Sequence, residues 1–503
     1  MPLSSQKFYI TTPIYYVNDR PHIGHAYTTI LADVLARYHR TAGDEVFFLT
    51  GVDEHGQKVL QAAQKKGVDP QRHCDELYPR FKELWRKLNI EFNRFIRTTE
   101  SEHVQVVQRT LQKLYANKKI YSNDYEGWYS VAEERFITDT EKDSGAFRDV
   151  MRLKEKNWFF KMSEYQDKLI KYIENHPEYI QPDHRRNEVL GFLRQPLGDL
   201  CISRPKSRMS WGIEIPFDKD YVTYVWFDAL VNYVTGVGYI FNEEKFKKWW
   251  PSDVHLIGKD ILTTHSVYWS TMLMAMGEEL PKTIFAHGWW LVGETKMSKS
   301  LGNVVNPLDL VDQYGADAVR YYLMREMVLG DDANFTVENF IKRYNSDLAN
   351  DYGNMLNRVS GLINKHFDGI IPGIHEINSA DQITINAATK LERKVMELID
   401  RLRIHEAIEE IIKLIRIVNA YIEMQAPWKE IRENRMERAG TILHISTDIL
   451  RICSIFLSPI MPQKTNQVLD ILGAVGTKPE LGQLKPGTKL KSHEALFPRI
   501  ETK

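Results

Sequence analysis

The sequence predicts an α/β fold, in which a doubly wound parallel sheet of the Rossmann type carries an inserted domain and is followed by a C-terminal α-helical bundle. Three observations lead to this prediction. The first fifty or so residues have the pattern strand, helix, strand, which is the βαβ unit of a parallel sheet. From about residue 345 onward, long runs show apolar residues at helical spacing. A chain of 503 residues is also too long for one core, so two to four domains are expected.

The elements of the βαβ unit can be placed in order. Aromatic and β-branched side chains predict a first strand at residues 8–12, and residues 14–19 are expected to turn. Apolar residues at helical spacing over 26–38 predict a helix that ends near Gly43. A second strand is expected at 46–49. Ligands bind beyond the carboxyl ends of such strands, so the segments that follow both strands are candidate site segments.

Composition excludes several classes of protein. The proportions of hydrophobic (43%) and charged (26%) residues are typical of a soluble globular protein, and no apolar run approaches a membrane span. The N-terminus lacks the apolar core of a signal peptide. Cys74, Cys201 and Cys453 are too scattered for a disulfide framework or a four-thiolate zinc site, which favours a reducing, cytoplasmic compartment. The net charge of -1 does not predict a nucleic-acid-binding protein, although a local basic stripe remains compatible with it.

The turn between the first strand and the helix contains two histidines, in residues 21–25 (PHIGH, here the histidine motif). His22 and His25 share one face of a first helical turn. Helix N–H groups are free there and the dipole is positive, so the motif predicts an anion site, most simply for a phosphate chain. Taken alone, the same spacing also fits metal ligands, with residues 53–55 (DEH) completing a hydrolase site.

A second signal lies far downstream, in residues 296–300 (KMSKS, here the lysine loop). Two lysines and two serines stand between Gly293 and Gly302, which predicts a mobile cationic clamp. An isolated pair of lysines at this spacing is more often a solvated turn. Together with the histidine motif in a βαβ unit, however, it favours the binding of a nucleotide.

The two stretches spell the HIGH and KMSKS signatures of the class I aminoacyl-tRNA synthetases, and residues 8–500 resemble the methionine-specific branch of that family. The resemblance implies a methionine–tRNA ligase activity. Such an enzyme activates L-methionine with ATP to methionyl-adenylate and pyrophosphate. It then transfers the methionyl group to the 3′-terminal adenosine of tRNA(Met), for initiation and elongation. A synthetase-like tRNA-binding protein without ligase activity is the alternative.

The implied reaction is in-line attack of a carboxylate on the α-phosphate. It requires alignment and charge stabilisation rather than a general base. The resemblance makes His22, His25, Lys296 and Lys299 the catalytic residues. Mg²⁺ is expected with the ATP rather than in a protein cage. The implied ATP-binding residues are Tyr16, His22, Gly24, His25, Gly258, Asp260, His287 and Lys299.

The resemblance also implies a pocket for methionine. An aromatic wall suits a polarizable sulfur, and Asp53 would bind the α-ammonium group by a charge-assisted hydrogen bond. The stripe over residues 226–233 also fits a plain helix core, and Leu230 stands where a proline is common in the family. The implied methionine-binding residues are Ile14, Tyr16, Asp53, Trp226, Ala229, Tyr233, Ile261 and His265.

The resemblance divides the chain into four parts. Residues 1–119 and 223–276 would form the Rossmann catalytic domain, and 120–222 the connective-peptide insertion. Residues 277–344 would be the stem-contact region with the lysine loop, and 345–503 the α-helical anticodon-binding domain.

Many members of the family hold zinc in the insertion through Cys-x-x-Cys knuckles. This chain has Ser130 and Glu133 where thiolates would stand, so no structural zinc is expected and no residue is assigned as a metal ligand.

Anticodon binding is implied for Asn354, Arg358 and Trp428, the last as a surface on which an unpaired base stacks. Without the resemblance, the first two would be ordinary surface residues and Trp428 a packing residue at a helix end. Some members continue into a dimerising domain, and this chain ends before it, so a monomer is expected. No membrane partner is expected.

Overall fold

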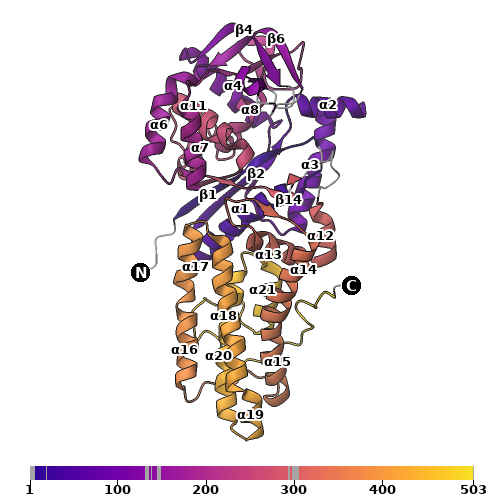
Figure 1. Cartoon of the computed structure of the whole chain (residues 1–503), viewed down its shortest axis with the longest axis vertical. Helices are drawn as coiled ribbons and strands as arrows, with labels where there is room; N and C mark the ends of the chain where they lie inside the picture. Colours follow the sequence, from indigo (N-terminus) through magenta and orange to yellow (C-terminus); the bar gives the residue numbers. More distant parts are fainter. Residues whose placement is uncertain are drawn as a thin grey trace. The chain divides into compact units, whose positions relative to one another are not determined.

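The structure is a computed structural model that describes residues 6–18, 20–130, 135–137, 139–143, 145, 149–292, 295–296 and 305–501. Its contacts separate two compact units (Figure 1). Unit 1 comprises Met1–Pro21, His39–Trp85 and Glu91–His287, and unit 2 comprises His22–Tyr38, Arg86–Ile90 and Gly288–Lys503.

Unit 1 is built on a six-stranded, wholly parallel sheet with the order β3-β2-β1-β12-β13-β7. The first strand lies inside the sheet and later strands add on both of its sides, so the predicted doubly wound fold is confirmed. The strands are β1 (Lys7–Tyr16), β2 (Glu45–Asp53), β3 (Arg94–Arg97), β7 (Ile180–Gln181), β12 (Val254–Gly258) and β13 (Thr283–His287). The helices include α2 (Gln57–Lys66), α3 (Pro70–Lys87), α4 (Ser101–Ala116), α8 (Val225–Leu230), α9 (Asn232–Thr235), α10 (Glu243–Trp249) and α11 (Ser270–Met276).

The first strand is longer than predicted. The expected turn at residues 14–19 begins only after Tyr16, because Ile14 to Tyr16 pair in register with Gly51 to Asp53 of β2. The register shifts between Thr11 and Ile14, next to Pro13. Proline has no N–H to donate to the ladder, so the strand bulges there and then resumes. The bulge places Ile14 and Tyr16 on the strand instead of on a loop.

The chain between β3 and β12 holds two smaller antiparallel sheets. The long antiparallel pair of β4 and β6 dominates the first of them (Figure 1), and β7 leaves this region to become an edge strand of the main sheet. The first sheet contains β4 (Ile120–Ser130), β5 (Arg135–Ile137), β6 (Val150–Phe160) and β8 (Leu200–Cys201), and the second β9 (Ser203–Pro205), β10 (Glu214–Ile215) and β11 (Asp218–Thr223). The helices here are α5 (Asp139–Asp143), α6 (Gln166–Asn175) and α7 (Asp183–Leu193).

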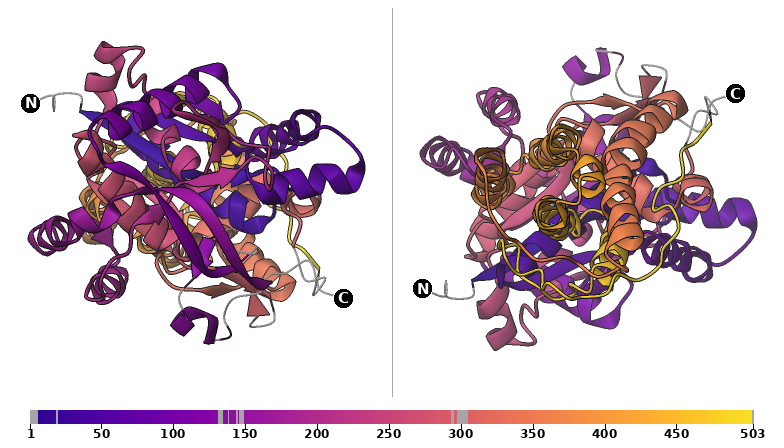
Figure 2. Two further views of the ribbon diagram at one scale, coloured as in Figure 1. Left: turned by 90° about the horizontal axis from the view of Figure 1, so that it is seen from above. Right: turned by 90° about the horizontal axis from the view of Figure 1, so that it is seen from below.

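Unit 2 is mainly helical. Figure 2, in its view from below, shows the long helices of the bundle end-on. Its helices are most of α1 (Ile23–Ala42), α12 (Pro307–Tyr314), α13 (Ala316–Glu326), α14 (Val337–Arg343), a π-helical segment (Tyr344–Gly353), α15 (Asn354–His366), α16 (Ser379–Thr389), α17 (Leu391–Asp400), α18 (Ile404–Gln425), α19 (Pro427–Arg432), α20 (Met436–Leu457) and α21 (Pro462–Ile471). Its strands are β14 (Trp290–Val292), β15 (Thr295–Lys296) and β16 (Ala333–Asn334).

The continuous helical pattern of residues 388–425 is divided among three helices. The α17 helix ends in a Schellman motif, in which the N–H of Leu402 bonds to the carbonyl of Ile399 and that of Arg403 to Leu398. Leu402 has a φ of 58°, a conformation usually taken by glycine. Because an apolar residue occupies the position, the sequence carries no stop signal there.

The α20 helix is the one described helix that is long and apolar enough to meet the criterion for a membrane span. Its apolar window is completely buried inside the structure. A core helix of a helical bundle meets the same criterion, and burial identifies α20 as such a helix.

Candidate functional site

The carboxyl edge of β1 and β2 places an acid beside an aromatic wall. Tyr16 and Asp53 are the last residues of their strands and are paired partners. Asp53 is only 2% exposed, and the Tyr16 ring meets the Trp226 ring edge-on at 6.2 Å. Ile14 and Ile261 are half-buried against the same core cluster as these rings. A buried carboxylate next to an apolar wall can bind a cationic group that carries an apolar chain.

A chain of hydrogen bonds orders the rest of that wall. The Nδ1–H of His265 donates to the carbonyl of Ile261 at 2.9 Å, and the Tyr233 hydroxyl donates to Nε2 at 2.8 Å. Burial lowers the pKa of His265 to about 4, so the ring is neutral near pH 7 and both of its nitrogens have fixed roles. Ala229 is buried on α8. The structure therefore brings together the predicted side chains of Tyr16, Trp226, Tyr233, Ile261 and His265.

A second predicted group meets at the carboxyl ends of β12 and β13, also in unit 1. Gly258 and His287 are paired partners, and Asp260 follows in the next turn. A Cβ atom at Gly258 would lie 2.6 Å from Asp260 Oδ1 and 3.8 Å from His287 Cε1. The glycine therefore lets the carboxylate fold back against the strand end. This acceptor beside a buried imidazole suits the hydroxyls of a ribose.

The histidine motif lies in unit 2, at the start of α1. The rings of His22 and His25 stack with centroids 3.8 Å apart. The N–H of Gly24 donates to His22 Nδ1 at 3.1 Å, and the N–H of His22 donates to His25 Nδ1 at 3.2 Å. The prediction that these N–H groups are free for an anion is thus wrong at these two positions, because the imidazoles cap the helix themselves.

This capping determines where the two rings carry their protons. Since each Nδ1 accepts a hydrogen bond, each proton resides on Nε2, and Nε2–H is the donor that a phosphate would meet. A Cβ atom at position 24 would lie 3.0 Å from His22 Cε1, so Gly24 makes room for the imidazole. The role of Gly24 in ATP binding stays a prediction, and the contact with His22 gives this position a structural role as well.

Only the start of the lysine loop is described. The backbone of Lys296 ends β15 and pairs with Leu291 of β14. Lys299 lies outside the described residues. The roles of both lysines stay predictions.

The three predicted anticodon residues lie in the helical bundle of unit 2. Asn354 opens α15 and is exposed, and Arg358 follows one turn later on the same face. The Arg358 guanidinium lies 5.6 Å from the Trp428 ring, and its Nη2 donates to Glu423 at 2.7 Å. A cation over a half-buried indole is a surface on which a base can stack.

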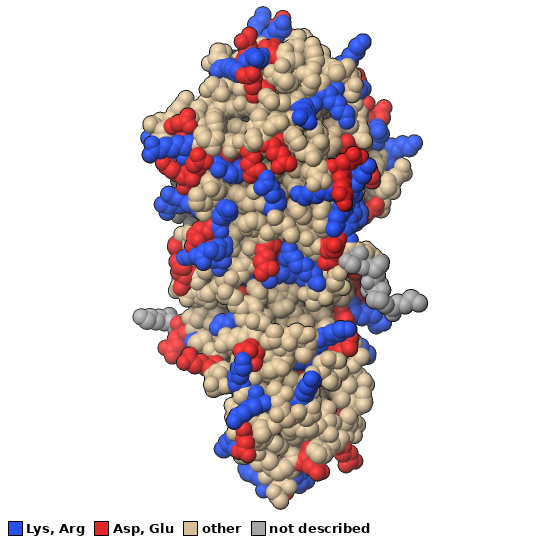
Figure 3. Space-filling view, turned by 180° about the vertical axis from the view of Figure 1, so that it is seen from behind, with Lys and Arg blue, Asp and Glu red and all other residues tan. Residues whose placement is uncertain are grey.

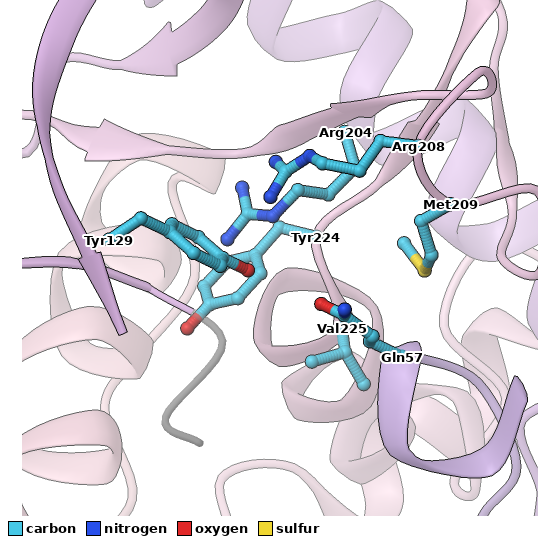
Figure 4. Close-up of a pocket in the computed structure, with 7 residues that line it drawn as sticks. All are labelled: Gln57, Tyr129, Arg204, Arg208, Met209, Tyr224 and Val225. Atoms are coloured by element: carbon cyan, nitrogen blue, oxygen red, sulfur yellow. The ribbon is translucent and has the colours of Figure 1, made fainter. Parts of the chain in front are cut away.

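Sequence reasoning missed a cavity in unit 1 (Figure 4). Arg204 is 3% exposed, and its guanidinium lies 4.5 Å from the ring of Tyr224 and 5.4 Å from that of Tyr129. The Arg208 guanidinium lies 4.6 Å from the Tyr129 ring and pairs with Glu155 at 2.8 Å. In the sequence the two arginines stand four residues apart, and that spacing alone does not predict a cavity. The cavity is also lined by Gln57, Met209 and Val225.

Among the described residues, no three His, Cys, Asp or Glu side chains are grouped closely enough to hold a metal ion. Ser130 is buried at the end of β4, whereas Glu133 lies outside the described residues. The expectation that the chain lacks structural zinc stays a prediction.

The surface has no single-sign field on the face that Figure 3 shows, where basic and acidic side chains alternate. This agrees with the net charge of -1. On this face, the mixed charges do not favour long-range attraction of an anionic partner.

Comparison with known proteins gives family models that match most of the chain. A model described as tRNA synthetases class I (M) matches residues 8–145 and 146–360. A model described as the anticodon binding domain of methionyl tRNA ligase matches residues 371–503.

Similar curated proteins and solved structures agree with these models. A methionine–tRNA ligase of Caldanaerobacter subterraneus subsp. tengcongensis is 46% identical and aligns with 98% of this chain and 79% of its own length. A methionine–tRNA ligase of Thermotoga maritima is 45% identical and aligns with 99% of this chain and 81% of its own length. Mycobacterium tuberculosis methionyl-tRNA synthetase in complex with methionyl-adenylate has a TM-score of 0.94 and 38% identity, over 98% of this chain and 100% of that one. Its apo form has a TM-score of 0.87 and 36% identity, over 99% of each chain.

Proposed function

The chain belongs to the methionine–tRNA ligase family of class I synthetases, and from this premise we propose that it joins L-methionine to tRNA(Met) in two steps. In the first, the methionine carboxylate attacks the α-phosphate of ATP, so that methionyl-adenylate forms and pyrophosphate leaves. In the second, a hydroxyl of the 3′-terminal adenosine attacks the acyl carbon and AMP leaves. The family and the ligase class follow from full-length similarity, whereas the residue roles below are proposals.

The amino acid would be held by the acid and the aromatic wall of unit 1. Asp53 would accept a hydrogen bond from the α-ammonium group, and the rings of Tyr16, Trp226 and Tyr233 would surround the thioether. The observation that carries this proposal is the buried carboxylate of Asp53 at the end of β2. Asp53 pairs in register with Tyr16, whose ring packs against Trp226 in the aromatic wall.

The phosphates would be bound by donors rather than by bases. The methionine carboxylate is already ionised, so the first step needs alignment of two anions and stabilisation of the charge that develops on phosphate oxygens. The Nε2–H groups of His22 and His25 are donors of the right kind. Lys296 and Lys299 would add positive charge in the transition state, and Gly258, Asp260 and His287 would bind the nucleoside.

Mg²⁺ would enter with the nucleotide. The described residues offer no cluster of three metal ligands, which fits a cation coordinated mainly by the phosphates of ATP and by water. It would neutralise phosphate charge, and the residues above would orient the two substrates.

We also propose a cytoplasmic monomer that needs no structural zinc. The three cysteines are free and buried, which suits a reducing compartment. Size-exclusion chromatography with light scattering tests the monomeric state, and a stable dimer would overturn it. A metal analysis of the purified protein tests the zinc proposal, and stoichiometric zinc would overturn that.

The exchange of labelled pyrophosphate into ATP tests the function directly. Methionine should support exchange, whereas leucine, valine and cysteine should not. Exchange with one of these and not with methionine would leave the class intact and overturn the specificity. No exchange with any amino acid, together with retained binding of tRNA, would favour the inactive tRNA-binding alternative.

A further inference from the structure

A carboxylate buried in unit 1 bridges two histidines beside the proposed methionine site. Asp228 lies on α8, directly before Ala229, and is fully buried. Its Oδ2 lies 2.6 Å from His55 Nδ1, and its Oδ1 lies 2.8 Å from His103 Nε2. Both histidines are buried as well. None of these three side chains belongs to the proposed methionine-binding or ATP-binding residues.

The protonation of the three bridged side chains follows from their contacts. Burial alone would raise the pKa of Asp228, yet the adjacent His55 and His103 hold it below its ordinary value, so the carboxylate is ionised. An ionised carboxylate only accepts hydrogen bonds. His55 must therefore donate through Nδ1–H, and His103 through Nε2–H.

The bridge joins the segment that carries Asp53 to the segment that carries the aromatic wall. His55 lies in the turn after β2, two residues beyond Asp53, and its N–H lies 3.4 Å from Asp53 Oδ1. Asp228 belongs to the α8–α9 segment that carries the aromatic wall. His103 comes from α4, and its Nδ1 lies 3.2 Å from Thr235 at the end of α9.

The turn after β2 is held on its other side as well. Glu54 is fully buried and pairs with Arg97 at 2.8 Å. Its N–H donates to Thr98 at 2.9 Å. Asp53 is thus followed by two residues anchored in different directions, and the anchor that leads to the aromatic wall is the pair of His55 and Asp228.

We propose that Asp228 is a positioning residue of the methionine site, which acts through His55 to hold the Asp53 carboxylate where an α-ammonium group meets it. The proposal rests on the function proposed above. In this proposal, the distance between Asp53 and the aromatic wall depends on the buried hydrogen bond between His55 and Asp228. Neither of these two side chains would contact the substrate.

The test is Asp228→Asn, which keeps the shape of the side chain. An amide has one acceptor oxygen, and its NH₂ group would face one of the two N–H donors. Either that bond is lost or the facing histidine must take its other tautomer, and both changes remove the charge-assisted bridge. We expect the KM for L-methionine in pyrophosphate exchange to rise about tenfold or more, with the KM for ATP changed less than about twofold. The matched control is Asp253→Asn, which removes a carboxylate that binds Tyr9 and Lys282 at the opposite, amino end of β12. It should leave both KM values unchanged.

An analogue without the ammonium group separates positioning from a general loss of structure. The probe is 4-(methylthio)butanoate, used as a competitive inhibitor of exchange. Asp228→Asn should leave its inhibition constant unchanged, because the thioether wall is intact, while the KM for L-methionine rises. An equal rise in the KM for L-methionine and in the inhibition constant of the analogue, or no rise in either, would overturn the proposal.

Two substitutions of His55 keep the proposal falsifiable if Asp228→Asn does not fold. The amide nitrogen of Asn occupies nearly the place of Nδ1, whereas that of Gln occupies the place of Nε2. His55→Asn should therefore preserve the KM for L-methionine and His55→Gln should raise it; the reverse order would overturn the proposal. If the unaltered protein itself shows no methionine-dependent exchange, the proposed function fails rather than this inference.

Discussion

At the residue scale, burial decides what the site residues can do. Asp53 is almost completely enclosed, so an ammonium group that reaches it gains a hydrogen bond to a charged acceptor in a poorly solvated place. His265 is enclosed as well, and burial lowers its pKa enough to keep it neutral although the nearby Asp260 carboxylate acts in the opposite direction. The carboxylate proposed to bind the ammonium group and the imidazole that burial keeps neutral thus belong to the same unit.

Replacing Asp53 tests the ammonium contact. Asp53→Asn should raise the KM for L-methionine about 10- to 100-fold, since a hydrogen bond to a charged group contributes about 1.5–3 kcal/mol. The KM for ATP should stay nearly constant. Steady-state pyrophosphate exchange measures both values, and an unaltered methionine affinity would remove Asp53 from the site.

The depressed pKa of His265 predicts a dependence of stability on pH. Between about pH 6.5 and pH 4 the unfolded chain binds a proton at His265 that the folded chain does not, so stability falls as the pH falls through this window. The full loss would amount to about 3 kcal/mol. The apparent Tm of the unaltered protein should therefore decline more steeply over this window than that of His265→Gln. Parallel curves would contradict the neutral imidazole.

At the element scale, the sequence predicts segments well when their signal is local. The βαβ unit and the amphipathic helices of the bundle both show their own periodicity. The end of α17 at Leu402 does not, because a non-glycine residue takes the left-handed conformation. Neither does the edge strand β7, whose two residues pair with a strand about a hundred positions away. Pairings of that kind depend on tertiary structure, and periodicity does not carry them.

The same distinction applies to the candidate site. Residues that belong to short motifs, such as His22 and His25, could be found from the sequence, as could those carried over from a family pattern. The partners of Asp228 and the cluster around Arg204 come from segments far apart in the chain, and nothing local marks them as neighbours.

Arg320 shows how three elements of unit 2 are joined. Its buried guanidinium binds Asp33 of α1 at 2.7 Å, the carbonyl of Leu88 after α3 at 3.0 Å, and those of Pro459 and Ile460 between α20 and α21 at 2.7 Å each. The helix that begins with the histidine motif is thereby attached to the end of the bundle.

Removing this side chain should destabilise unit 2. Arg320→Met leaves the Asp33 carboxylate and three carbonyls with fewer partners in a buried place, at a cost of about 3–5 kcal/mol. The control is Arg393→Met, whose side chain is 82% exposed and pairs only loosely with Glu397, so its effect should be near zero. Chemical denaturation measures the stability of both variants. Equal denaturation midpoints for Arg320→Met and Arg393→Met would contradict the structural role of Arg320.

At the scale of the whole molecule, the proposed activity uses residues from both units. The proposed methionine pocket belongs to unit 1, and the surface formed by Arg358 and Trp428 belongs to unit 2. The two reaction steps make different demands on these residues. Adenylate formation needs only the small substrates, whereas transfer also needs the tRNA, so a change at the bundle should affect one step and spare the other.

Trp428→Ala should separate the two steps. Loss of the stacking surface removes about 1–3 kcal/mol of binding for one base, so kcat/KM for tRNA charging should fall about 5- to 150-fold. Pyrophosphate exchange should stay within about twofold, because the change lies outside the unit that holds the methionine pocket. The control is Ile383→Ala, an apolar truncation on α16 at a side chain that is 68% exposed, which should leave both activities unchanged. Equal losses of exchange and charging for Trp428→Ala would indicate a folding defect. Full retention of charging would exclude the indole from anticodon recognition and leave Asn354 and Arg358 as the residues to test.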